Sequence, residues 1–234
     1  MMSNTNQPVV LAFDVFGTVV DWYGSIRQEV EQVLPDVNAD AFTLAWRDGY
    51  LPAMAAVNAA NEWVLLDTLH RQILDAVLEK FDQSDVGEKT RQSLVKGWHR
   101  LSPWPDTVPG LIRLKEQFMV CSLSNGNLGL LANMAKNAGI PWDCVLSAEV
   151  FKRYKPDPKT YLGVAEIFDL QPEQVMLVAA HQQDLDAARS CGLQTAFIER
   201  PHEYGPVRGN DVSGSRNNHW HATDFNHLAE LLGC

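Results

Sequence analysis

Four short apolar segments divide the chain, and polar residues follow each of them. The segments cover residues 9–13, 118–123, 175–179 and 195–198. A continuous apolar run of this length is typical of a strand that is buried on both faces of a parallel sheet. Segments with helical periodicity lie between them, at 128–138, 159–168 and 185–192. The alternation predicts an α/β fold built on a Rossmann-like, doubly wound parallel sheet, in which ligands bind at the carboxyl ends of the strands.

One long region breaks this alternation, because from residue 22 to about 101 the periodicity is helical and no strand is indicated. Its helical segments are 24–34, 39–59, 63–81 and 88–98, and prolines at 103 and 105 mark its end. We therefore expect a core of residues 1–21 and 103–234, with residues 22–102 inserted as a helical cap subdomain. Such a cap would cover the carboxyl edge of the sheet and exclude water from a small site.

The end of the chain has a different composition. Gly, Ser, Asn and Arg are frequent over residues 207–218, which predicts a loop before a last helix at 224–232. Two alternate histidines, His219 and His221, lie between them and are candidate metal ligands. A solvated loop is the preferred interpretation, because no cysteine stands at ligand spacing.

Charge and cysteine content restrict the class of protein further. The 234 residues include 29 Asp and Glu against 19 Lys and Arg, so the surface should repel nucleic acids and anionic membranes. The four cysteines lack zinc-site spacing and are interpreted as reduced thiols. Residues 1–8 carry no basic side chain, and the first apolar run stops at Asp14. Neither a signal peptide nor a membrane span is predicted, and we expect a cytoplasmic location.

Chemically capable side chains follow several of the apolar segments. Asp14 follows the first, Ser124 and Asn125 follow the second, and His181 and Asp184 follow the third. Each motif alone is also compatible with an ordinary turn or loop. Several together, at the predicted ligand-binding edge of one sheet, are harder to explain in that way. Lys155 is a further candidate. It precedes a proline in an extended segment, where its ammonium group could keep a carboxylate ionised.

The order of these motifs resembles the haloacid dehalogenase superfamily over nearly the whole chain. The matching motifs are Asp14-Val15-Phe16-Gly17-Thr18, Ser124-Asn125-Gly126, Lys155-Pro156-Asp157 with Tyr161, and Asp184. Trp46-Arg47 and residues 200–206 resemble the type II branch, the 2-haloacid dehalogenases. The resemblance implies an aspartate nucleophile in a Rossmann-like core under a helical cap. It also implies hydrolysis of short 2-haloalkanoic acids to 2-hydroxyacids and halide.

Related phosphatases provide the main alternative, a hydrolase acting on a small phosphorylated metabolite. Phosphatases of the superfamily carry a second Asp two residues after the nucleophile, and this chain has Phe16 there. Their magnesium-binding Asp in the fourth motif is matched by Ala180. These differences favour a metal-independent dehalogenase with no cofactor. A third interpretation, a non-catalytic module that binds a small carboxylate, is disfavoured because it would retain costly partly buried charges.

The resemblance also implies roles for individual residues in ester formation. Asp14 would attack the carbon that bears the halogen, and Arg47 with Asn125 would bind the departing halide. Without the resemblance, Arg47 would be taken for a solvated arginine on a helix. An (S)-2-haloacid dehalogenase-like activity follows.

The remaining matched residues would support the nucleophile and the water. Lys155 would hold Asp14 ionised, with Tyr161 beside the lysine, and Ser124 with Thr18 would hydrogen-bond the nucleophile or the substrate carboxylate. Asp184 would position or activate the hydrolytic water.

The chain departs from the usual type II pattern at His181, which stands where an Asn is common. The sub-branch with this Ala-Ala-His pattern includes members that cleave fluoroacetate. His181 is interpreted as a base paired with Asp184, as a hydrogen-bond donor to the halide or the ester, or as a histidine packed at a strand end.

Other residues carry weaker expectations. Trp63, with Tyr23 and Trp104, would wall an apolar pocket, although core packing explains tryptophans equally well. His202 and Glu203 follow the fourth apolar segment and would only close the site. Apolar helix faces permit a homodimer, which is common in the family, without requiring one.

Overall fold

A six-stranded sheet forms the centre of the molecule in the computed structural model, which describes residues 7–234. Its strands are β1 (Val10–Phe13), β4 (Met119–Ser124), β5 (Cys144–Ser147), β6 (Val175–Ala179), β7 (Gln194–Ile198) and β8 (Trp220–Ala222). They lie in the order β5-β4-β1-β6-β7-β8, and every neighbouring pair is parallel. The predicted Rossmann-like sheet is therefore confirmed.

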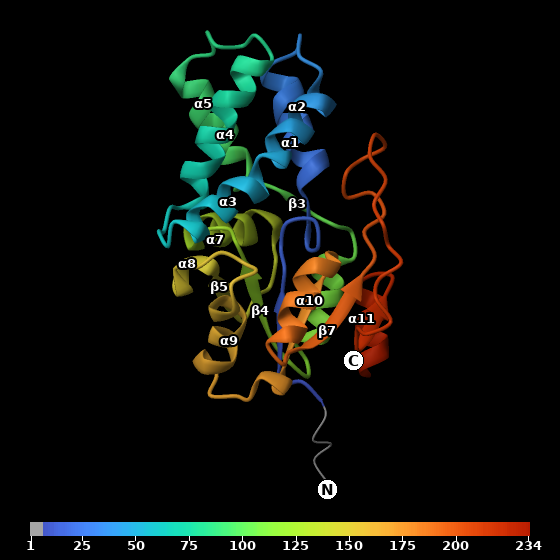
Figure 1. Cartoon of the computed structure of the whole chain (residues 1–234). Coiled ribbons are helices and arrows are strands. Elements are labelled where there is room, and N and C mark those ends of the chain that lie inside the picture. Colours follow the sequence, from blue (N-terminus) through green and yellow to red (C-terminus); the bar gives the residue numbers. More distant parts are fainter. Residues whose placement is uncertain (1–6) are drawn as a thin grey trace, which may run out of the picture.

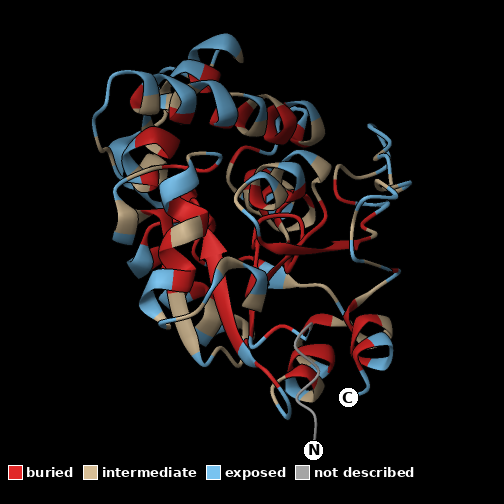
Figure 2. Cartoon of the chain, turned by 60° about the horizontal axis from the view of Figure 1, so that its bottom comes forward, coloured by how far each residue is buried: buried red, intermediate tan, exposed pale blue. Residues whose placement is uncertain are grey.

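Helices cover both faces of this sheet because successive side chains of each strand point to opposite sides. Leu11 and Phe13 belong to one hydrophobic cluster with residues of α6 (Thr107–Leu114), α7 (Leu128–Ala138) and α11 (Phe225–Leu232). Val10 and Ala12 belong to a second cluster, with α9 (Pro158–Ile167) and α10 (Gln182–Ser190). Figure 2 shows the strands largely buried between helices whose outer sides are exposed.

The strand order reverses at β1, and this places the site. The chain proceeds from β1 to β4 and β5 on one side, and β6, β7 and β8 are added on the other. Asp14 directly follows β1, Asn125 directly follows β4, and His181 comes two residues after the end of β6. Because parallel strands end at one edge, the three residues are gathered at the crevice where ligands bind in such sheets.

The helical insertion lies above this edge in Figure 1. It consists of α1 (Trp22–Val33), α2 (Ala39–Asp48), α3 (Tyr50–Ala59), α4 (Leu66–Lys80) and α5 (Glu88–Gly97). The two segments that join it to the core pair with each other as antiparallel strands, β2 (Val20–Asp21) and β3 (Ser102–Pro103). The division into a core and a cap domain at 21/22 and 102/103 stays a prediction.

The helix expected over 39–59 is in fact two helices, which meet at Gly49. Pro52 explains the break, since its ring lacks an amide hydrogen and would clash with the carbonyl group of Asp48 in a continuous helix. Gly49 also lies close to α4, and a Cβ atom there would be 2.5 Å from Ile73 Cγ2. The helix expected from residue 63 begins only at Leu66.

Several further elements were not predicted. Strand β5 has four residues and continues directly into the short helix α8 (Ala148–Phe151), and α6 contains Pro109 and Gly110, which disfavour helices. Strand β8 replaces the solvated loop expected around His219 and His221. A single turn of 3-10 helix, η1 (Pro172–Gln174), precedes β6. The loop before β8 and the last helix are confirmed.

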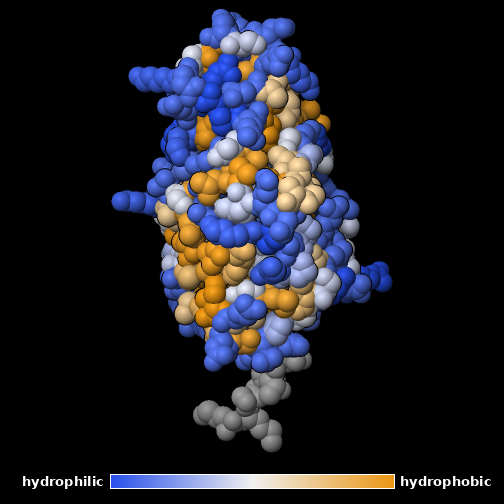
Figure 3. All heavy atoms as spheres, turned by 60° about the vertical axis from the view of Figure 1, so that its left-hand side comes forward, coloured by the Kyte–Doolittle hydropathy of each residue, from blue (hydrophilic) through white to orange (hydrophobic). Residues whose placement is uncertain are grey.

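The outer surface bears on two of the expectations. Figure 3 shows the side of the molecule where α7, α8 and α9 lie, with hydrophobic residues gathered on its lower half. Leu128, Val150 and Ile167 are exposed on these helices.

Within residues 7–234, no helix is long and apolar enough to cross a membrane. The expectation for residues 1–8 falls mostly on positions 1–6, which lie outside the described residues. The homodimer stays a prediction.

Candidate active site

Asp14 lies at the centre of the site, directly after β1. Its backbone amide donates to the carbonyl oxygen of Val178 on β6, which continues the sheet by one hydrogen bond of 3.0 Å. The chain then turns at Gly17, which has a φ of +88° that favours glycine. This turn brings Thr18 back, so that its hydroxyl donates to Asp14 Oδ2 at 2.8 Å. The Thr18 hydroxyl in turn accepts from the Ala180 amide at 2.9 Å.

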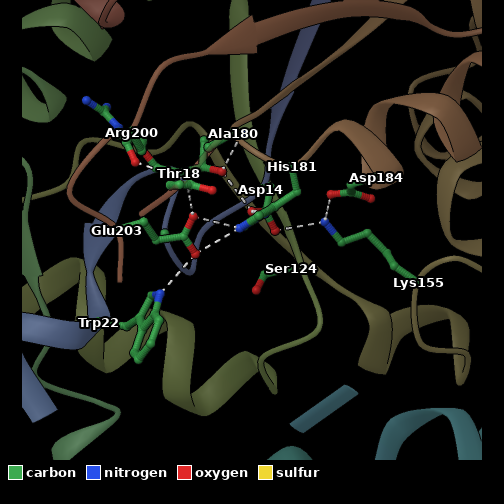
Figure 4. Close-up of polar contacts among 12 residues, drawn as sticks. Asp14, Thr18, Trp22, Ser124, Lys155, Ala180, His181, Asp184, Arg200 and Glu203 are labelled. Atoms are coloured by element: carbon green, nitrogen blue, oxygen red, sulfur yellow. Dashed lines mark hydrogen bonds and ion pairs between the residues drawn. The ribbon is translucent and has the colours of Figure 1, made fainter. Parts of the chain in front are cut away.

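Lys155 contacts the other carboxylate oxygen of Asp14. Its ammonium nitrogen lies 2.9 Å from Asp14 Oδ1 and also donates to Asp184 Oδ2. The Tyr161 hydroxyl donates to Asp184 Oδ1 at 2.6 Å. The position of Lys155 is set by its backbone amide, which donates to Asn125 Oδ1 at 2.8 Å. These four sequence-predicted residues therefore form one connected group with Asp14, as Figure 4 shows in part.

Burial and charge act in opposite directions on Asp14. Burial raises the pKa of the carboxyl group, but the charge of Lys155 and the contact with His181 outweigh burial and bring the pKa below its ordinary value. The Lys155 pKa is raised, because Asp14 and Asp184 outweigh the opposing effect of burial. Asp14 is consequently an ionised carboxylate and Lys155 an ammonium ion throughout the physiological pH range.

His181 contacts two carboxylates rather than Asp184, its expected partner. Nδ1 lies 3.1 Å from Asp14 Oδ2, and Nε2 lies 2.9 Å from Glu203 Oε1. Burial lowers the pKa of His181, but the charges of Glu203 and Asp14 outweigh it and raise the pKa from 6.5 to about 10. Since an ionised carboxylate only accepts hydrogen bonds, both ring nitrogens are donors and the ring is an imidazolium.

Glu203 is the residue whose role sequence reasoning missed. Its side chain is fully buried, and its oxygens accept from Trp22 Nε1 at 3.0 Å and from Asn210 Nδ2 at 3.2 Å. A Cβ atom at Gly17 would lie 2.3 Å from Glu203 Oε1, so glycine also makes room for this carboxylate. The signal was available, because Glu203 follows β7 at the same edge of the sheet. The neighbouring His202 is exposed.

Arg47 comes from α2 in the insertion and faces the same cavity as Asp14. Its guanidinium carbon lies 4.3 Å from the centre of the Tyr50 ring and 5.1 Å from that of Trp22. The buried Nη1 atom has no hydrogen-bond partner among residues 7–234. Aromatic rings thus hold a positive charge with an unused donor at the cavity that Asp14 also lines, as an anion site requires.

A second buried histidine, His70, lies behind Arg47 in the insertion. Its ring stacks on Trp98, with the ring centres 4.3 Å apart, and Phe16, Trp46 and Tyr50 also surround it. Neither ring nitrogen has a hydrogen-bond partner in the described part of the chain. Burial lowers the pKa of His70 from 6.5 to about 3, so this ring is neutral.

The cavity above Asp14 has a volume of about 720 Å³. Its lining includes the expected residues Arg47, Asn125, Lys155, Tyr161, His181 and Asp184. Ser124, in contrast, is fully buried and does not line the cavity, and its hydroxyl accepts a hydrogen bond from the Gly126 amide at 3.1 Å. Trp63 is not brought to the cavity, and its ring packs on Tyr154 at 4.7 Å between ring centres. Tyr23 and Trp104 do not line the cavity either.

Metal ligands are sparse around this cavity. Among residues 7–234, no group of three or more His, Cys, Asp or Glu side chains is arranged to hold a metal ion. Phe16 and Ala180 line the cavity at the two positions where phosphatases of the superfamily carry aspartates. His219 and His221 diverge, because His219 Nδ1 accepts from the Thr195 amide, whereas His221 pairs with Glu199.

The fold and the site together define a hydrolase with a Rossmann-like sheet, an inserted helical region and a buried aspartate after the first strand. The model of the haloacid dehalogenase-like hydrolases matches residues 9–192, and the chain belongs to this family. The crystal structure of the defluorinating L-2-haloacid dehalogenase Rha0230 has 44% sequence identity and a TM-score of 0.93, covering 97% of this chain and 96% of that one. That of the L-2-haloacid dehalogenase PA0810 has 43% identity and a TM-score of 0.91, covering 97% and 99%. (S)-2-haloacid dehalogenase 4A of Burkholderia cepacia is 29% identical over 84% of this chain and 87% of its own length.

Proposed function

We propose that this protein hydrolyses short (S)-2-haloalkanoic acids to 2-hydroxyacids through an ester on Asp14, with fluoroacetate within its range. One observation carries the proposal: an ionised carboxylate, held by Lys155 and Thr18, faces an arginine whose Nη1 donor is unused by the described residues. The similarity to L-2-haloacid dehalogenases, one of them defluorinating, supports the same activity.

In the first half-reaction, a carboxylate oxygen of Asp14 attacks the carbon that bears the halogen. The new C–O bond forms as the carbon–halogen bond breaks, and the halide leaves with the bonding electrons. Arg47 stabilises this developing anion, and the Asn125 side chain lines the same cavity. Phe16 contributes no acid at this stage, and none is needed because halide leaves as an anion.

In the second half-reaction, water adds to the carboxyl carbon of the ester. In the free protein, Thr18 donates to one Asp14 oxygen and Lys155 to the other. One of these oxygens carries the alkyl group in the ester, and the donor on the other favours the charge that develops on the carbonyl oxygen. Breaking the bond between the Asp14 carbonyl and the alkyl oxygen releases the 2-hydroxyacid and restores the carboxylate.

Halide release in the presence of EDTA tests this function. Bromoacetate, each enantiomer of 2-chloropropionate and fluoroacetate would be compared for the wild type, Asp14→Asn and a surface control, Asp186→Asn, whose side chain is 49% exposed. We expect release by the wild type and the control, preference for the (S) enantiomer, and no detectable release by Asp14→Asn. Release that survives in Asp14→Asn, or magnesium-dependent phosphate release without dehalogenation, would contradict the proposal.

Two expectations about context stay predictions. The family resemblance favours a homodimer, which light scattering at several protein concentrations would detect. The cytoplasmic location is expected from the reduced cysteines and from the absence of a predicted signal peptide or membrane span.

A further inference from the structure

We propose that Glu203 is a positioning residue for the second half-reaction, in which it orients His181 to accept a proton from the water that hydrolyses the Asp14 ester. The inference rests on the proposed function and adds the origin of the hydrolytic base. It makes Glu203 the partner of His181, a position for which the sequence had suggested Asp184, and it gives His181 the part in activating water that Asp184 was also expected to play.

The geometry places one histidine between two carboxylates. Nδ1 of His181 faces Asp14 at 3.1 Å, and Nε2 faces both oxygens of Glu203, at 2.9 and 3.0 Å (Figure 4). The His181 side chain is 27% exposed and lines the cavity, whereas Glu203 is fully buried. A solvent molecule can therefore reach the histidine but not the carboxylate behind it.

Glu203 is itself held in a fixed position. Trp22 and Asn210 donate to its oxygens from α1 and from the loop after β7. Because its carboxylate accepts from Nε2–H, a neutral His181 would carry its proton on Nε2 and present the Nδ1 lone pair toward Asp14. This is the tautomer that a base beside Asp14 requires.

Asp184 is less available for the same task. Its Oδ2 accepts from the Lys155 ammonium group, and its Oδ1 accepts from the Tyr161 hydroxyl. Protonation of Asp184 during catalysis would weaken both contacts, one of which is to a buried cation. We therefore assign Asp184 to holding Lys155.

Formation of the ester changes the charge next to His181. The Asp14 carboxylate, which stabilises the imidazolium in the free enzyme, becomes a neutral ester. The pKa of His181 consequently falls, and the ring releases a proton to solvent. Neutral His181 can then take a proton from water as the water oxygen bonds to the carboxyl carbon.

The intermediate then collapses with a balanced transfer of protons. The bond between the carboxyl carbon and the alkyl oxygen breaks, and the alkyl oxygen takes the proton from Nδ1 to give the 2-hydroxyacid. Asp14, left as a carboxylic acid, loses a proton and becomes a carboxylate again, which restores the imidazolium. One proton in total is released per ester hydrolysed.

The charged groups that face the pair determine its pH dependence. Glu203 and Asp14 raise the pKa of His181. The charge of Arg47 acts on Glu203, Lys155 acts on Asp14, and Asp21 is coupled to Glu203. Removing the negative charge of Glu203 should therefore lower the pKa of His181 in the ester.

Rapid-quench measurements with bromoacetate separate the two half-reactions. In Glu203→Gln, the glutamine amide can donate to Nε2 and place the proton on Nδ1, where it blocks the base. We expect a stoichiometric burst of bromide at a rate within about threefold of the wild type. Hydrolysis should then be about 10²–10³-fold slower, and mass spectrometry should show the ester on Asp14.

Controls distinguish this result from a structural defect. Glu199→Gln makes the same change at a carboxylate that pairs with His221 near the surface, and it should leave turnover unchanged. Glu203→Asp should restore part of the hydrolysis rate. The rate of ester hydrolysis should rise with pH to a plateau, and in Glu203→Gln the midpoint should move to lower pH.

Each other outcome has a definite meaning. Unchanged turnover, or an equal loss of burst and hydrolysis in a folded Glu203→Gln, would overturn the role of Glu203. If that variant does not fold, His181→Asn decides, because full hydrolysis in that variant would also overturn the inference. No bromide release by the wild type would instead refute the proposed function.

Discussion

Residues of the core and of the insertion line one cavity. The polar groups around Asp14 in the core have hydrogen-bond partners, whereas those of Arg47 and His70 in the insertion include atoms without one among residues 7–234. On the core side, Lys155, Thr18 and His181 all contact the Asp14 carboxylate. On the side of the insertion, Nη1 of Arg47 and both ring nitrogens of His70 lack partners among the described residues. Charge on the core side is therefore satisfied before substrate binds, whereas the insertion retains a donor for an anion that the protein does not supply.

Two buried histidines show what this difference means. Two carboxylates raise the pKa of His181 to about 10, but burial among aromatic rings lowers that of His70 to about 3. At neutral pH one is therefore a cation that belongs to an ion-pair network, and the other is a neutral part of an aromatic wall. The same residue type acquires its charge from its neighbours.

The largest expected effect follows from breaking the network on the core side. Lys155→Met removes the cation between Asp14 and Asp184. Asp184 then keeps only the Tyr161 hydroxyl as a partner among the described residues, and Asp14 loses one of the two cations that contact it. We expect halide release to fall by at least about 10³-fold and the free energy of unfolding to fall by about 3–5 kcal/mol. Halide assays and urea unfolding would measure the two effects. Lys159→Met, at an exposed lysine, serves as the control, and near-normal activity of Lys155→Met would contradict the prediction.

A smaller effect is expected on the opposite wall. Arg47→Lys keeps the positive charge but loses the planar guanidinium that lies against Tyr50 and Trp22. We expect the rate of the halide burst to fall by about 10²-fold, which corresponds to about 2.7 kcal/mol, with little change in ester hydrolysis. Arg27→Lys on α1 is the matched control. Equal slowing of both half-reactions would argue against a role at the halide.

The smallest effect concerns stability and pH. The folded pKa of His70, about 3, lies below its ordinary value of 6.5. Below pH 6.5 the unfolded chain therefore binds more protons at this residue, and its contribution to stability is lost as pH falls from 6.5 toward about 3. At pH 5 the loss is about 2 kcal/mol.

His70→Phe should remove this acid-dependent loss without removing an observed side-chain hydrogen bond. Urea unfolding at several pH values between 7 and 4.5 would measure it, with the exposed His202→Phe as the control for one fewer histidine. An unchanged pH dependence in His70→Phe would show that His70 does not determine acid stability.

The sequence predicted those parts of the fold that depend on local pattern. Continuous apolar runs indicated β1, β4, β6 and β7, and motif order placed Asp14, Lys155 and Asp184 at one edge. Strands β5 and β8 escaped because short strands carry too little pattern to separate them from loops. The break at Gly49 was overlooked although Pro52 indicates it.

Partner choice within the site was the part that local pattern could not predict. His181 and Asp184 are three residues apart, which suggested a pair, yet the Rossmann-like topology brings Glu203 to His181 instead. The hydrogen bond from Trp22 to Glu203 joins residues that are 181 positions apart in the chain. Only the packing of the insertion on the core determines such contacts, and no spacing in the sequence reports it.

The antiparallel pairing of β2 with β3 has a consequence for how this protein can change over evolutionary time. The chain leaves the core at Asp21 and returns to it at Ser102, and these residues face each other in the two-stranded ribbon. The roughly 80 residues between them enter and leave at one point. A helical module of another size or lining can therefore be exchanged there, so that a lineage can acquire a new substrate range while the strand order that carries Asp14 stays intact.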